Sequence, residues 1–171
     1  LLRAPCNKKY KGKNQKIHGG SYVCVQPDAR LDLSSFTLQA FIFPTTPDKG
    51  AQGIVTKWIG PRQSGYGMFV DDDGSLACWI GDGKGKTTKV STGKPLLRKV
   101  WYLAAVSFDA KSGRIKVYQQ PIVTPTNGGL GMSLLHPATQ TEGTSTGSSK
   151  IKPATNDAPL TFAANTRRSK S

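Results

Sequence analysis

Hydrophobic and polar residues alternate along the chain in short runs, which is the pattern of β-strands. In residues 36–43, Phe36, Leu38, Ala40 and Ile42 fall on one side of the chain and the intervening residues on the other. A period of two residues predicts a strand, and no run shows the longer period of an amphipathic helix. The runs expected to form strands are residues 21–25, 36–43, 53–58, 66–70, 76–80, 86–91, 101–108, 114–119 and 160–164.

Glycine-containing turns separate these runs and indicate how the strands are connected. An Asp73-Gly74 step joins two β-rich runs, which is typical of a hairpin because glycine takes the positive φ that the turn needs. Residues 81–85 and 109–113 have similar turn compositions. About eight strands at this spacing predict an all-β fold, a two-sheet antiparallel β-sandwich of the jelly-roll type.

The apolar positions also predict which side chains fill the space between the sheets. Residues 36–43 carry apolar side chains on both sides, which favours a central position in a sheet. Residues 101–108 form the most apolar run, and residues 114–119 alternate between apolar and polar, as in a strand with one wet face. The residues expected to contribute most to the core are Phe36, Leu38, Ile42, Trp101, Leu103, Val106, Ile115 and Val117.

Composition divides the chain into a sandwich and two basic ends. Residues 1–17 are a basic N-terminal arm, residues 18–166 are the predicted sandwich, and residues 167–171 are a basic tail. Within the sandwich, residues 121–158 are rich in Thr, Ser, Gly and Pro and predict a long polar loop region. Basic ends of this kind are either solvated tails or docking arms.

The charge of the chain indicates the chemistry of its partners. Lys and Arg total 24 against 10 Asp plus Glu, which gives a net charge of +14 and favours an acidic partner. We expect that partner to be another protein chain or domain, with a glycan as the alternative. Nucleic acid is not expected, because the aromatic and basic motifs of RNA-binding folds are missing. No stretch approaches the roughly 20 apolar residues of a membrane span.

Three cysteines, Cys6, Cys24 and Cys78, bear on the redox environment. An odd and low count does not describe a disulfide framework, and the chain has no Cys-x-x-Cys pair for zinc. Cys24 and Cys78 lie inside apolar runs, where a thiol behaves as a small hydrophobic group. This usage favours a reducing compartment and a cytoplasmic location, with an extracellular location as the alternative.

An acidic turn is the candidate metal site of the sequence. Asp71, Asp72 and Asp73 could offer oxygen ligands to Ca²⁺, which takes several of them at once. Consecutive residues on a strand point in alternating directions, which favours a solvated hairpin turn instead. Asp71 and Asp73 are the candidate calcium ligands.

Large aromatic residues are the candidate platform for a bound sugar. Trp79 is out of phase with Leu76, Cys78 and Ile80, so it is the aromatic side chain most expected to be exposed. The alternative is that it packs in the core, as large aromatics of a sandwich commonly do. The candidate ligand-binding residues are Trp79, Tyr66, Asp82 and Lys84.

The sequence lacks the residue pairs that hydrolytic enzymes need. The chain has a single glutamate, Glu142, in a polar segment, whereas glycosidases use two carboxylates as acid and nucleophile or base. No Gly-x-Ser-x-Gly element accompanies its serines, and His18 and His136 lie in loop-like sequence. We therefore expect no catalytic residues, and no hydrolysis of glycosides or amides by the chain alone.

The order of these features resembles the concanavalin A-like and laminin G-like superfamily over about residues 18–166. The best matching piece is Trp-Tyr-Leu-Ala-Ala-Val-Ser-Phe-Asp at residues 101–109, followed by residues 113–118. The resemblance implies a jelly-roll sandwich with a lectin-like surface. Further matching pieces are residues 20–23, 31–33, 36–42, 53–58, 66–70, 74–76 and 159–165.

A narrower resemblance rests on two segments. Tyr-Gln-Gln-Pro at residues 118–121, together with residues 45–54, is similar to the lectin-like module in the large subunit of bacterial N,N-dimethylformamidases. This resemblance implies membership of an iron-dependent amidohydrolase that releases dimethylamine and formate. It also implies that the iron ligands, two Tyr and a Glu, lie in another part of that subunit, and no segment here matches their surroundings.

One departure from the superfamily pattern leads to a structural expectation. Relatives usually follow the strand at residues 159–165 with a Gly-x-Ile-Asp strand that closes the sheet, and this sequence has none. We expect the open edge to be filled by another chain, a second copy, or continuing polypeptide, with residues 6–16 as the internal alternative.

Three functions follow from the sequence, in order of preference. The first is a non-catalytic recognition or assembly module within a larger amidohydrolase of the N,N-dimethylformamidase type. The alternatives are a free-standing carbohydrate-binding, lectin-like domain and a basic nucleic-acid-binding protein.

Overall fold

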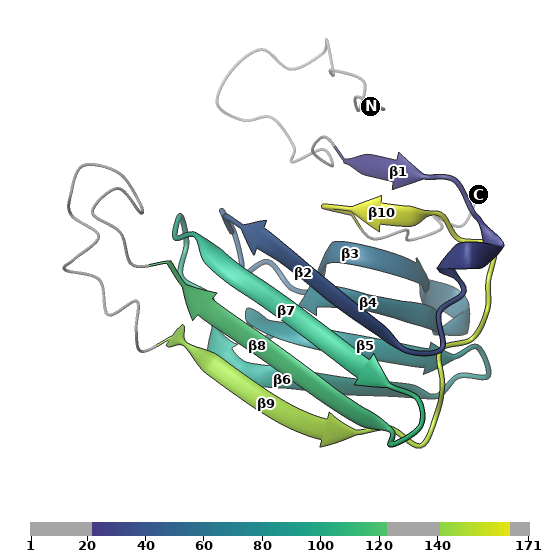
Figure 1. Cartoon of the computed structure of the whole chain (residues 1–171). Coiled ribbons are helices and arrows are strands. Elements are labelled where there is room, and N and C mark those ends of the chain that lie inside the picture. Colours follow the sequence, from purple (N-terminus) through teal and green to yellow (C-terminus); the bar gives the residue numbers. More distant parts are fainter. Residues whose placement is uncertain (1–21, 123–140, 165–171) are drawn as a thin grey trace, which may run out of the picture.

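A computed structural model describes residues 22–122 and 141–164 as two antiparallel β-sheets packed face to face (Figure 1). The six-stranded sheet has the order β1-β10-β3-β4-β5-β6, and the four-stranded sheet has the order β2-β7-β8-β9. The predicted all-β sandwich is confirmed. The strands are β1 (Val23–Val25), β2 (Phe36–Ile42), β3 (Gln52–Ile59), β4 (Ser64–Val70), β5 (Ser75–Asp82), β6 (Thr87–Pro95), β7 (Tyr102–Asp109), β8 (Arg114–Pro121), β9 (Gly143–Ser148) and β10 (Leu160–Phe162).

Two short 3₁₀ helices, η1 (Ala29–Leu31) and η2 (Gly60–Arg62), complete the described elements. In the described part of the chain, no helix is long and apolar enough to cross a membrane. The predicted basic ends, residues 1–17 and 167–171, lie outside the described residues, as do Cys6, His18 and His136.

All the predicted strands are present, but the polar loop region contains one that the sequence pattern missed. The prediction of a loop over residues 121–158 is wrong for residues 143–148, which form β9 and pair with β8 from Gln119 opposite Gly143 to Arg114 opposite Ser148. Strand pairing uses the backbone, so small polar side chains do not prevent it. A Cβ atom on Gly147 would lie 2.4 Å from a methyl carbon of Val90 on β6, so glycine permits this close packing.

The core lies between the sheets, and the phase of β7 differs from the prediction. Tyr102, Ala104, Val106 and Phe108 are buried, whereas Trp101 is 44% exposed. The prediction that Trp101 is a core residue is therefore wrong, and Leu103 is only half-buried on the outer face. The other predicted core residues do pack in the central cluster: Phe36, Leu38, Ile42, Val106, Ile115 and Val117.

The position of β2 also differs from the prediction. β2 pairs with β7 along its whole length, from Phe36 opposite Phe108 to Ile42 opposite Tyr102. It is one of the two edge strands among the described strands of the four-stranded sheet, so the prediction of a central strand is wrong. The apolar residue on its outer face, Phe41, is 66% exposed.

The burial of Cys78 predicts an unreactive thiol. The side chain is completely buried on β5, and burial raises the pKa of its thiol to about 12. The thiolate is the reactive form, so at pH 8.5 we expect labelling by a thiol reagent about a thousandfold slower than for an unfolded chain. A variant with Cys6→Ser and Cys24→Ser isolates this thiol. Rapid labelling of the folded variant would mean that β5 is not buried as described.

Candidate functional site

The predicted ligand-binding residues do not form one site. Tyr66 and Trp79 lie on neighbouring strands, but Tyr66 belongs to the central core and Trp79 to a cluster on the other face of the six-stranded sheet. Asp82 is the last residue of β5, and Lys84 lies in the turn that follows. The structure brings Asp82 and Lys84 together, with the backbone N–H of Lys84 donating to the Asp82 carboxylate at 2.8 Å, but it places Tyr66 and Trp79 on opposite faces of the sheet. Glycan binding stays a prediction from the sequence.

Trp79 is packed and not presented to a ligand. Its ring stacks on Phe69, with centroids 4.2 Å apart, and Trp58 packs edge-on at 5.8 Å. The ammonium of Lys89 lies 3.7 Å from the ring centroid, in the geometry of a cation–π contact. Only 8% of Trp79 is exposed, so the prediction that it is an exposed platform is wrong, although its phase on β5 was predicted correctly. Its buried indole N–H has no hydrogen-bond partner among the described residues.

Tyr66 has a structural role. Its ring stacks on Phe36 at 4.6 Å, and its hydroxyl donates a hydrogen bond of 2.8 Å to the carbonyl oxygen of Leu31 in η1. Burial raises the pKa of this hydroxyl to about 12, with a smaller contribution from the negative charge of Asp32. The side chain joins the two sheets and anchors η1, so the prediction of a ligand-binding role is not supported by its position.

The acidic turn is a hairpin turn whose carboxylates contact neighbouring groups of the protein. Asp73 accepts hydrogen bonds from the backbone N–H and the hydroxyl of Ser75, and Asp71 accepts one from the backbone N–H of Asp72. Asp71 also forms an ion pair of 3.7 Å with Lys89. The structure groups no three His, Cys, Asp or Glu residues suited to a metal within its described ranges. Calcium binding at Asp71 and Asp73 stays a prediction.

Four other carboxyl groups have lowered pKa values, and the causes are local. A hydrogen bond from the Arg30 side chain lowers the pKa of Asp28, and one from the Arg98 side chain lowers the pKa of Asp48. A hydrogen bond from the backbone of Lys84 lowers the pKa of Asp82. In the β7–β8 turn, a hydrogen bond from the Ser112 side chain similarly lowers the pKa of Asp109. A lowered pKa keeps these carboxylates ionised at neutral pH, which suits the ion pairs and turn hydrogen bonds that they form and not the role of a general acid.

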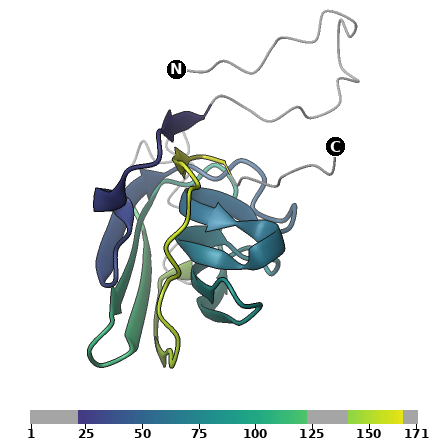
Figure 2. The same ribbon diagram turned by 90° about the vertical axis from the view of Figure 1, so that its right-hand side faces the viewer.

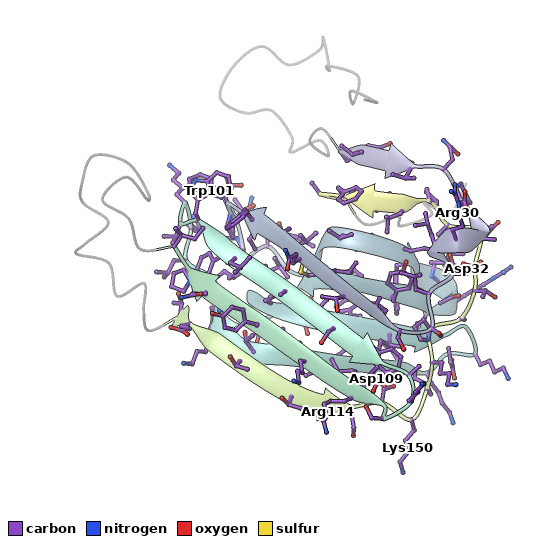
Figure 3. The ribbon with its side chains drawn as sticks, viewed as in Figure 1. Arg30, Asp32, Trp101, Asp109, Arg114 and Lys150 are labelled. Atoms are coloured by element: carbon purple, nitrogen blue, oxygen red, sulfur yellow. The ribbon has the colours of Figure 1, made fainter. Side chains whose placement is uncertain are left out.

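The exposed apolar residues gather on one side of the sandwich instead. Phe41 is 66% exposed, Phe43 is 39% exposed, and the Phe43 ring lies 5.2 Å from that of Trp101. We call Phe41, Phe43 and Trp101 the aromatic patch. Figure 3 shows Trp101 at one end of the four-stranded sheet, with Asp109 and Arg114 at the opposite end. Large aromatic residues are enriched at protein interfaces, so the patch is a candidate contact surface.

A groove lies beside the patch, between the free edge of β2 and the strands β3 and β10. Its volume is about 810 Å³. Ala40 to Pro44 form one wall, Gly50 to Val55 another, and Phe162 to Ala164 the third. Figure 2 shows the two sheets from the side, with β1 and β10 at the same end of the molecule. The aromatic patch and this groove together form the candidate functional site.

Sequence analysis did not find this site, although the sequence contains one signal for it. Phe41 and Phe43 have the same parity in an alternating strand, opposite to that of the core residues Phe36 and Ile42. An apolar side that faces away from the core indicates either a covered sheet or a contact surface. The alternation did not distinguish these possibilities, because only the sheet order shows which strand is at an edge.

A comparison with protein families agrees with the fold. The model of the concanavalin A-like lectin/glucanases superfamily matches residues 18–131. A solved structure of the CBM40 domain of Ruminococcus gnavus IT-sialidase, bound to alpha2,3 sialyllactose, superposes with a TM-score of 0.42 and 10% identity. That comparison covers 81% of this chain and 80% of the solved chain.

Two curated relatives match the sequence more strongly. The N,N-dimethylformamidase beta subunit of Alcaligenes sp is 34% identical over 133 residues, and that of Paracoccus aminophilus is 33% identical over 134 residues. Each match covers 77% of this chain but 17% of the relative, so the chain spans about a sixth of the length of these relatives. The resemblances to the superfamily and to the N,N-dimethylformamidase module are both confirmed.

Proposed function

We propose a function for this chain on the basis that it belongs to the concanavalin A-like lectin/glucanases superfamily. The chain serves as a non-catalytic recognition or assembly module, and it acts as part of a larger protein of the N,N-dimethylformamidase type. The relatives support this proposal, because their sequence similarity to the chain is confined to a stretch of about a sixth of their length. Catalysis in such a protein belongs to the rest of the polypeptide.

The aromatic patch is the observation that supports assembly, that is, the docking of this chain on the rest of the larger protein. The aromatic residues on the outer face of the six-stranded sheet, such as Phe69 and Trp79, are covered by packing against one another. Phe41 and Trp101 keep 66% and 44% of their surface exposed. Burying such side chains against a partner removes apolar surface from water, and aromatic anchors contribute strongly to binding at interface centres.

Charge supports an acidic partner surface. The chain carries a net charge of +14, and Lys99 lies next to the patch because its backbone N–H donates to the carbonyl oxygen of Pro44. Lys49 lies on the wall of the neighbouring groove. Opposite charge on the partner would speed association and favour one orientation, and this contribution falls as salt increases.

If the aromatic patch docks on a partner, substitutions in the patch should prevent the chain from assembling with that partner. We expect the chain to copurify with an Alcaligenes N,N-dimethylformamidase beta subunit from which the matching segment has been deleted. The double variant Phe41→Ser, Trp101→Ser should reduce the amount recovered at least about tenfold, because both anchors are lost. A control double variant, Lys116→Ser with Thr146→Ser, changes the same sheet away from the patch and should copurify normally.

Two results would contradict the proposal. The first is equal recovery of the patch variant and the control. The second is release of dimethylamine from N,N-dimethylformamide by the isolated chain, with loss of that activity in Glu142→Gln, since Glu142 is the one glutamate of the sequence.

A further inference from the structure

The two sheets differ in their number of strands, and the six-stranded sheet extends beyond the other at the edge next to the aromatic patch. At the other edge the sheets match, because β9 packs against β6. At this edge the six-stranded sheet extends past β2 with β10 and β1, which lie beyond the upper edge of the four-stranded sheet (Figure 1). No described strand pairs with the free side of β2. The four-stranded sheet therefore has room for a further strand opposite β10.

Apolar side chains already face this position. Val23 pairs with Phe162 and Val25 with Leu160, so these four side chains share one face of the six-stranded sheet. Leu160 packs against the central core, which identifies the face as the inner one. Val23, Val25 and Phe162 are nevertheless 48%, 41% and 37% exposed. A further strand in the four-stranded sheet would cover these side chains, which explains why apolar residues of the inner face are exposed.

The free side of β2 offers backbone groups with which a further strand could pair. Every second backbone N–H and C=O of an edge strand points away from its neighbour and is available to an incoming chain. β2 is seven residues long, contains no proline, and pairs on its free side with no described strand. Natural edge strands are commonly protected by charged residues, and β2 carries none in its sequence Phe-Thr-Leu-Gln-Ala-Phe-Ile.

The geometry points to strand addition: a segment of another polypeptide pairs with the free side of β2 and fills the groove between β2 and β10. The segment is extended, about as long as β2, apolar at alternate positions and acidic at the others. Its apolar side chains pack on Ile54, Val25 and Phe162, and its backbone pairs with β2. This inference deepens the proposed assembly function and rests on it, since it names the kind of contact that the partner makes.

Two other occupants fit less well. Residues 165–171 read Asn-Thr-Arg-Arg-Ser-Lys-Ser and have no apolar side chain to place in the groove. A second copy of the chain would bring together two molecules that each carry a charge of +14. Acidic residues on an incoming strand would instead offset the charge of the chain.

A synthetic peptide tests this inference. The probe is the seven-residue peptide acetyl-Glu-Val-Glu-Ile-Glu-Val-Glu-amide, titrated to about 1 mM into the full chain, a range that detects even weak association. Binding is followed by the NMR signals of the β2 amides. We expect saturable shifts at β2 and β10. Methylating the backbone nitrogens that face β2 should reduce affinity at least about tenfold, since it removes the pairing hydrogen bonds and leaves the side chains.

A pair of variants locates the binding position. Phe162→Asp places a charge in the groove and should weaken peptide binding at least about tenfold. Thr144→Asp makes the same kind of change on the opposite edge strand, β9, and should leave binding unchanged. Circular dichroism confirms that both variants are folded before affinities are compared.

The results of these experiments distinguish a failure of strand addition from a failure of the proposed assembly function. Peptide binding that is indifferent to backbone methylation, or absent at β2, overturns strand addition. If the aromatic patch variant still loses copurification in that case, the assembly function stands without it. Dimerisation of the chain that Phe162→Asp abolishes would also overturn the inference, because the occupant would then be a second copy.

Discussion

Replacing Tyr102 with alanine lowers the free energy of unfolding by about 3–5 kcal/mol, whereas the same change at Trp101 lowers it by less than about 1 kcal/mol. Tyr102 is completely buried and packs with Val70, Leu96 and Val100. Truncation leaves a cavity and also leaves the backbone N–H of Leu97 without the hydroxyl to which it donates at 2.9 Å. Trp101 is the larger side chain, but it is 44% exposed.

Chemical denaturation of the two variants measures this difference directly. Tyr102→Phe separates the contributions, since it retains the ring and removes the hydroxyl, and it should cost about 1–2 kcal/mol. A greater loss for Trp101→Ala than for Tyr102→Ala would show that β7 has the opposite phase.

The phase of β7 could have been predicted from the sequence. In an alternating strand, residues of one parity share a face, so Trp101 and Val106 cannot both face the core. The hairpin turn at residues 109–113 places Val106 opposite Val117 and Phe108 opposite Ile115. Those pairs fix the even-numbered residues of β7 as the inner ones. The size and hydrophobicity of Trp101 favour the core, whereas the pairing places this residue on the outer face.

Replacing the buried Lys57 with methionine lowers the free energy of unfolding by about 3–5 kcal/mol, because it leaves polar partners unpaired. Its side chain on β3 is 2% exposed, and its ammonium lies 3.2 Å from a carboxylate oxygen of Asp32. The same ammonium donates hydrogen bonds to the carbonyl oxygens of Asn156, at 2.5 Å, and Ala158, at 3.1 Å. These contacts hold the segment that leads into β10.

Two further variants test the cause. Asp32→Asn removes the opposite charge but retains the three acceptors supplied by Asn156 and Ala158, so it should cost less, about 1–3 kcal/mol. Lys84→Met removes an exposed lysine from a turn and should change stability by less than about 0.5 kcal/mol. If Lys57→Met costs no more than Lys84→Met, the ammonium does not hold the segment in place.

Sequence analysis predicted the strands well because alternation and glycine turns act locally. It missed β9, whose Gly143–Ser148 sequence lacks the apolar alternation that marks a strand and depends on pairing with β8. It placed Trp79 correctly out of phase with the core, but it could not show that Phe69 and Lys89 cover the ring, since those residues arrive from neighbouring strands. The candidate site was missed for the same reason. The edge position of β2 and the different numbers of strands in the two sheets depend on how the strands assemble, so they cannot be predicted from any single segment of the sequence.

The most direct test of the open edge is amide hydrogen exchange along β2 in the isolated chain. We predict alternating behaviour, with slow exchange for the amides that pair with β7 and fast exchange for those that point to the groove. Addition of the acidic peptide should slow the fast set and leave the slow set unchanged. Uniform protection of β2 in the isolated chain would contradict this account, because the strand position beside it would then already be filled.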